Sequence, residues 1–171
     1  MDRLPRLYFW TALIFLTACS SSGEIKISKP LVERIDNSDV AALSVSASAS
    51  VDSSDSEIRE VMQRLQGALF GRLVSEGVFK QVVHENEPSQ YFIDVKLMDA
   101  DEVSQGARIF LGVLAGANSL IVSVTVTDTG KDEHVTNFVV TGKSASHPLS
   151  SENDMDDAIR EVVDEIILAL R

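Results

Sequence analysis

The fold is decided by a stretch past the middle of the chain, Leu120–Lys131, which reads LIVSVTVTDTGK. Up to Val126 its even positions are apolar, and serine or threonine fills most of the odd ones. Such alternation is typical of a strand that buries one face. Because the turn residues Asp128-Thr129-Gly130 follow, and the β-rich run Val135–Thr141 comes next, the stretch predicts a β-hairpin.

The same alternation recurs upstream of the hairpin. Leu43–Val51 places every apolar residue on an odd position with serines between them, and Tyr91–Met98 alternates with apolar character on both faces. A serine-rich linker is the alternative for the first run, but a linker gives no reason for the strict spacing. Both runs therefore predict strands, and the shorter Val78–Val83 predicts another.

Two helices are predicted from apolar spacing. The first is expected to begin at a capping box formed by Ser54 and Glu57 and to end at Gly77. The second is expected to begin near Asn153. Their apolar faces consist of Ile58, Val61, Met62, Leu65, Leu69 and Leu73 in the first helix, and of Ile159, Val162, Val163, Ile166 and Leu170 in the second.

The order strand, helix, strand, strand, hairpin, helix predicts an α+β fold. Two amphipathic helices need one surface to cover, and a mainly antiparallel sheet with one polar face provides it on its other side. We expect a two-layer sandwich of about five strands with both helices on one face. The first strand would reach the second through a βαβ crossover if these two are parallel neighbours.

The N-terminus indicates export and lipid attachment. After Arg3 and Arg6, the uncharged run Leu7–Leu16 is about half the roughly 20 residues that a transmembrane helix requires. Leu16–Cys19 resembles the bacterial lipobox, in which the cysteine is acylated and becomes the new N-terminus. Acylation also explains a single unpaired cysteine in an exported chain, whereas the alternative is an odd thiol beside an ordinary cleavage site.

Processing at Cys19 sets several further expectations. The residue after the cysteine is Ser20 and not an aspartate. By resemblance to enteric-type lipoprotein sorting, this favours the outer membrane over the inner one, with the domain in the periplasm. Residues 19–39 are interpreted as a lipidated leash, in which Ile25–Ile35 is either leash or edge strand, and residues 40–171 as a single domain. Removal of residues 1–18 leaves 13 basic and 25 acidic residues, a net charge of −12. This charge disfavours nucleic acid and anionic lipid as partners.

The stretch Gly106–Ala117 separates the two halves of the domain and is apolar and punctuated by glycines. With Gly106, Arg108, Gly112, Gly116-Ala117 and the turn Asp128–Gly130 in this order, the region Val40–Leu170 resembles the domain-of-unknown-function 4410 family. That resemblance implies a bacterial envelope lipoprotein and assigns no activity.

The apolar stretch has two interpretations. It is either core packed under the sheet or an exposed contact for a partner, a second copy or the membrane interface. Arg108 either fixes the loop or an acid such as Asp99 or Asp101, or binds a partner's carboxylate. The candidate contact residues are Arg108, Ile109, Phe110, Leu111, Val113 and Leu114.

No catalytic or metal-binding motif is recognisable in the sequence. The three histidines, His84, His134 and His147, have no ligand spacing, and the run from Asp99 to Gly106 departs from a calcium loop. The acids of the last helix are interpreted as a solvated face. We therefore predict no catalytic residue, metal or cofactor.

The leading functional hypothesis is a non-enzymatic outer-membrane lipoprotein that binds a periplasmic protein or cell-wall component. One alternative is a structural subunit that assembles with itself through the glycine-rich stretch. The other is an envelope hydrolase with an unrecognised acidic dyad or Ser/His group.

Overall fold

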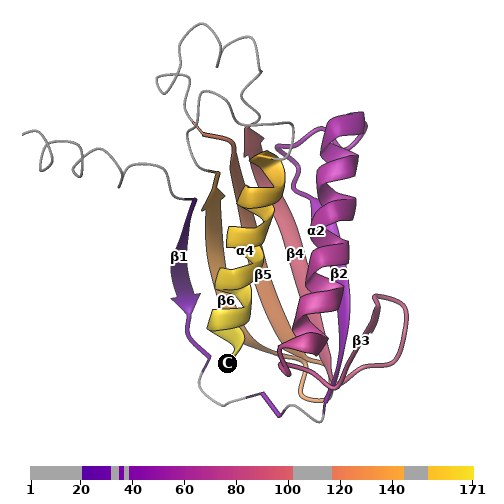
Figure 1. Cartoon of the computed structure of the whole chain (residues 1–171). Coiled ribbons are helices and arrows are strands. Elements are labelled where there is room, and N and C mark those ends of the chain that lie inside the picture. The colour runs from indigo at the N-terminus through magenta and orange to yellow at the C-terminus, as the bar shows by residue number, and fades with distance from the viewer. Residues whose placement is uncertain (1–20, 32–34, 37–38, 102–116, 145–153) are drawn as a thin grey trace, which may run out of the picture.

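The computed structural model describes residues 21–31, 35–36, 39–101, 117–144 and 154–171. A single mixed sheet in the strand order β1-β6-β5-β4-β2-β3 carries two helices on one face (Figure 1). This arrangement confirms the α+β fold class, with six strands in place of about five. The elements are β1 Ser22–Lys29, β2 Val40–Ala47, α2 Ser56–Ser75, β3 Gln81–His84, β4 Tyr91–Asp101, β5 Ser119–Asp128, β6 Glu133–Lys143 and α4 Asp154–Leu170.

The hairpin predicted around Asp128 is present as the antiparallel pair β5 and β6, in which Val124 lies opposite Phe138. The Asp128 carboxylate accepts hydrogen bonds from the backbone N–H groups of Gly130 and Lys131, at 3.0 and 3.1 Å. An aspartate that binds the backbone two residues on stabilises a turn. The sequence thus defines this hairpin locally.

The expected crossover is also present, because β2 is parallel to β3 and α2 lies between them in the chain. The helix cap differs from the expectation. Asp55, not Ser54, caps α2 by accepting from the Glu57 N–H at 2.9 Å. Ser54 binds Asp52 through both its N–H and its hydroxyl, since that carboxylate is two residues away and forms a competing turn.

The leash interpretation of residues 19–39 is corrected by β1, which begins at Ser22 and pairs antiparallel with β6. Of the two alternatives for Ile25–Ile35, the edge strand is therefore right as far as Lys29. A β-strand forms here because the free edge of β6 offers backbone partners to any extended segment that can reach it. Lys26 and Lys29 place charge on this outer edge.

The core lies between the helices and one face of the sheet. It includes the predicted apolar face of α4 and the alternate residues of the central strands, such as Val95, Val122, Val124 and Phe138, all fully buried. Gly142 allows α4 to approach β6 closely, because a Cβ there would overlap the Ala158 carbonyl oxygen and the Val162 side chain.

Candidate functional site

The residues singled out in the sequence as sites lie outside the described part of the structure. These are Cys19 and the candidate contact residues between Arg108 and Leu114. Both interpretations of the apolar stretch, and the acylation of Cys19, therefore stay predictions. What the structure does show is where the chain enters and leaves these regions, at Ser21, Asp101 and Ala117.

An open groove of about 440 Å³ runs between α2 and α4. Small and apolar residues form part of its lining, because Gly67 has no side chain and Ala68 has a short one. A Cβ built on Gly67 would meet nothing within 4 Å, so the glycine leaves space between the helices. The residues that line the groove are Arg64, Gly67, Ala68, Arg72, Asp156, Ile159, Arg160 and Val163.

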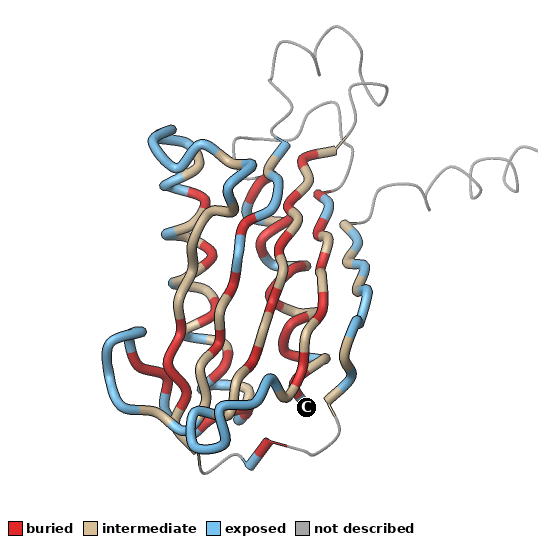
Figure 2. The backbone as a smooth tube through the Cα atoms, turned by 180° about the vertical axis from the view of Figure 1, so that it is seen from behind, coloured by how far each residue is buried: buried red, intermediate tan, exposed pale blue. Residues whose placement is uncertain are grey.

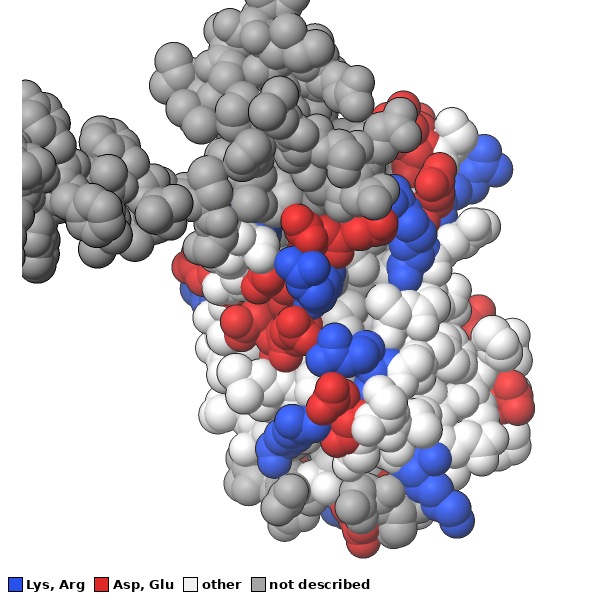
Figure 3. All heavy atoms as spheres, in the orientation of Figure 1, with Lys and Arg blue, Asp and Glu red and all other residues white. Residues whose placement is uncertain are grey.

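The charged residues of the groove are engaged with one another. Arg64 binds Asp156 at 2.9 Å, and Arg72 binds Asp164 at 2.7 Å, so each pair links α2 to α4. Arg160 binds Asp157 within α4 at 2.9 Å. Figure 3 shows these opposite charges interleaved over the helical layer. The acids of α4 are thus more than a solvated face, because two of them, Asp156 and Asp164, form ion pairs with α2.

Neither described histidine is placed for chemistry with the groove. His84 packs its ring 5.1 Å from that of Phe70, and His134 shares a 2.9 Å hydrogen bond with Thr127. The hydrolase alternative calls for a pocket that joins carboxylates from distant strands. The groove instead lies between helices, and its single carboxylate, Asp156, is paired with Arg64.

The described residues contain neither a metal-binding cluster nor a membrane-spanning helix. No group of three or more histidine, cysteine or acidic side chains is arranged to hold a metal ion. Nor does any helix within these ranges combine the length and the apolar character needed to cross a membrane.

Among the described residues, no helix or strand packs on the face of the sheet opposite α2 and α4. Figure 2 views the molecule from this side, where the strands alternate between buried and half-buried residues and no helix lies in front of them. We call it the uncovered face. Its residues on the central strands are Ser44, Ser46, Phe92, Asp94, Lys96, Ile121, Ser123, Thr125, Asn137 and Val139.

Strand register arranges the uncovered face in transverse rows, since directly opposite residues share a face. One row runs Ser44, Asp94, Thr125, Asn137 and the next runs Ser46, Lys96, Ser123, Val139. Within the first row the Asn137 amide donates to the Thr125 hydroxyl at 2.8 Å. Lys96 joins the two rows through Asp94 at 3.2 Å.

Apolar side chains interrupt this polar surface. Phe92, Ile121 and Val139 are half-buried, and Met98 at the end of β4 is 40% exposed. Hydroxyls and amides can form hydrogen bonds with another protein, and the scattered apolar groups can pack against it. Chemically, the face is suited to recognition.

The strands are predictable from the sequence, whereas the uncovered face is not recognisable in it as a site. The serines and threonines between the apolar positions do indicate a polar face that is not part of the core. Their number alone does not separate a solvent-exposed face from a binding face. The inter-helix groove had no comparable signal, because its ion pairs join residues about 92 positions apart in the chain.

Comparison with protein families identifies a family for most of the chain. The model described as "Domain of unknown function (DUF4410)" matches residues 27–148. No curated protein matches the sequence.

Comparison with solved structures finds the same fold in distant proteins. Two crystal forms of the PelC dodecamer from Paraburkholderia phytofirmans superpose with TM-scores of 0.58 and 0.55 at 11% and 13% identity. Each match covers 86% of this chain, and 97% and 96% of the PelC chain respectively. The DUF330 protein XCC0632 from Xanthomonas campestris has a TM-score of 0.49 at 10% identity, covering 88% of this chain and 90% of that one. At these identities the likeness to PelC shows a shared fold.

Proposed function

The chain belongs to the DUF4410 family, and from that premise we propose that it is a non-enzymatic, lipid-anchored protein of the bacterial outer membrane. Its folded domain works in the periplasm by binding protein, with copies of itself as the first partner. Cys19 carries the anchor. A cell-wall component is the other class of partner that fits a protein tethered at this place.

The observation that carries the proposal is the uncovered face. With β5 about 33 Å long and five long strands about 4.8 Å apart, its area is roughly 800 Å², the share that each partner contributes to a standard protein interface. The helical layer is less suited to this role, because its charges are already paired between α2 and α4.

Self-association is favoured by the likeness to PelC, which forms dodecamers. A fold that covers one face of its sheet with helices leaves the same surfaces, the other face and the outer strands, for contact between copies. The glycine-rich stretch with Ile109 to Leu114 is the second candidate contact and stays a prediction from sequence.

The test is the mass of the acylated protein extracted from membranes in detergent, measured by light scattering after size-exclusion chromatography. We expect a multimer, and we expect Thr125→Arg on the uncovered face to shift it toward monomer. Leu168→Arg is the matched control, because Leu168 is 69% exposed on the helical layer. A monomeric parent protein would contradict self-association.

Two further variants separate the alternatives. Leu111→Asp tests the glycine-rich stretch, and if it alone dissociates the multimer, the contact lies there and not on the uncovered face. Mass spectrometry of the mature N-terminus tests the anchor. It should show acyl chains on Cys19, and a cleaved but unmodified cysteine would contradict the lipoprotein assignment.

A further inference from the structure

The folded domain begins almost at the anchor. β1 starts at Ser22, so Ser20 and Ser21 are the only residues between Cys19 and the sheet. Across two peptide units the chain spans at most about 7 Å, which limits how far Ser21 can lie from Cys19. A domain on so short a tether cannot turn freely above a membrane.

Ser21 is itself held against the domain. Its hydroxyl donates to the Glu161 carboxylate at 2.5 Å, and the Arg160 guanidinium donates to the same hydroxyl at 3.3 Å. Both partners lie on α4. The sheet and a helix therefore fix the chain up to Ser21, one residue beyond the start of β1.

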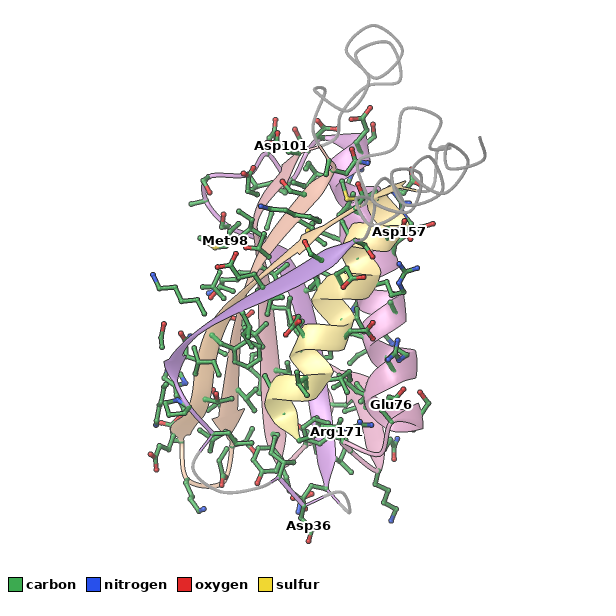
Figure 4. All side chains as sticks on the ribbon, turned by 60° about the vertical axis from the view of Figure 1, so that its left-hand side comes forward. Asp36, Glu76, Met98, Asp101, Asp157 and Arg171 are labelled. Atoms are coloured by element: carbon green, nitrogen blue, oxygen red, sulfur yellow. The ribbon has the colours of Figure 1, made fainter. Side chains whose placement is uncertain are left out.

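The anchor lies at a defined end of the sheet. Ser22 is opposite Lys143, Lys143 is opposite Ser119, and Ser119 is opposite Asp101, so these four residues form the last row across β1, β6, β5 and β4. Immediately beyond it, Asn118 and Ser144 exchange hydrogen bonds that link β5 to β6. In Figure 4, Asp101 and Asp157 lie toward this end, and Asp36 and Arg171 toward the other.

We propose that the domain stands end-on at the lipid surface, with the end of the sheet that carries the row Ser22, Lys143, Ser119, Asp101 turned toward the membrane. This inference rests on the acylation of Cys19 proposed above. Among the described residues of this end, Asp99, Asp101 and Asp157 are acidic, and Lys143 and Arg160 are basic. The partner surface is therefore a zwitterionic headgroup layer reached through the tether, because anionic lipid would repel these carboxylates.

The orientation has a consequence for binding. Strands that run along the membrane normal present the uncovered face and the edges β1 and β3 sideways. Copies anchored in one leaflet then lie at the same distance from the membrane, with the same end of the sheet toward it. A second copy can meet these surfaces by lateral diffusion, so the tether favours assembly in the plane of the membrane.

The experiment measures the depth of two sites in the acylated protein, reconstituted into phosphatidylcholine vesicles that contain a headgroup-spin-labelled lipid. Lys143→Cys places a fluorophore at the anchor end and Lys131→Cys places one in the distal turn, about 30 Å away along the strands. Since acylation uses Cys19, each variant has one free thiol. We expect the probe at residue 143 to be quenched severalfold more than the probe at residue 131.

Lengthening the tether provides the decisive comparison. Six Gly/Ser residues inserted between Ser20 and Ser21 should remove most of the quenching at residue 143, whereas the same insertion after Gly130 should leave it unchanged. Equal quenching at both sites, or quenching that the longer tether does not alter, would overturn the orientation. The mass of the purified protein is measured first, so that absence of acyl chains, which removes the proposed function as well, is distinguished from an acylated domain without fixed orientation.

Discussion

The two faces of the sheet are formed by the same strands but differ in burial and polarity. Toward the helices, Val95, Val122 and Phe138 are fully buried. One position away, Lys96, Ser123 and Asn137 are at least partly exposed, and Lys96 and Asn137 contact Asp94 and Thr125. A strand turns successive side chains to opposite faces. The difference shows that one set of residues forms the core, whereas the adjacent set is not needed for it.

The largest expected difference between the faces comes from truncating neighbours in β6. Phe138→Ala should lower the free energy of unfolding by about 3–5 kcal/mol, because it leaves a cavity in the core. Val139→Ala on the uncovered face should cost less than about 1 kcal/mol. Urea denaturation followed by circular dichroism measures both, and equal losses would mean that the uncovered face is packed against something in solution.

A glycine pair tests the covered face from the side of its helices. Gly142→Ala should destabilise the protein by about 1–3 kcal/mol, because the new methyl group overlaps the Ala158 carbonyl oxygen and α4 must move. Gly67→Ala is the matched control. It meets open space on α2 and should stabilise the protein by about 0.5–1 kcal/mol through helix propensity. Thermal or urea melts that show the same sign for both would contradict the close approach of α4 to β6.

The contact between the helices should contribute less than the core beneath them. Arg72→Gln and Asp164→Asn, singly and together, should give a coupling free energy of about 0.2–1 kcal/mol. The reason is that the two side chains are 37% and 45% exposed, so water screens their attraction. A double-mutant cycle at low and high salt measures this value. A coupling well above that range, unaffected by salt, would show that the pair is buried in an assembly.

The smallest effect is expected at the distal turn. The hydrogen bond from the Lys131 backbone N–H, above other causes, lowers the pKa of Asp128 from its ordinary value. Because the pKa is depressed in the folded state, the stabilisation is present above about pH 4 and is lost as pH falls through the folded pKa. The stability difference between the parent protein and Asp128→Asn in urea should therefore shrink between pH 6 and pH 3, and a difference independent of pH would contradict this role.

Much of the fold could be predicted from the sequence because its signals are local. The alternation in Leu120–Thr127, the Asp128 turn and the apolar spacing of both helices each depend on residues a few positions apart, and each predicted element is present. Gly77 ends α2 as expected, with φ of 66°, a conformation that glycine adopts without strain. The cap was the local exception, since Asp55 and Ser54 compete for neighbouring backbone groups.

The sequence also predicted two candidate sites without showing where they lie in the fold. Cys19 and the stretch Arg108–Leu114 were recognised from motif and composition, and both fall outside the described residues. The uncovered face and the inter-helix groove, in contrast, consist of side chains from elements distant in the chain. Only strand register and helix packing bring Asp94 beside Thr125, or Arg72 beside Asp164.

By itself, then, the sequence determined which segments are strands and helices, the negative charge of the domain and the expectation of a lipid anchor. The tertiary structure decided that the supposed leash is β1, because whether an extended segment stays free or joins a sheet depends on an open edge elsewhere, here that of β6. It also decided which face stays uncovered. Alternation makes each strand two-sided, but both helices pack on the same side of the sheet only through contacts far apart in the chain.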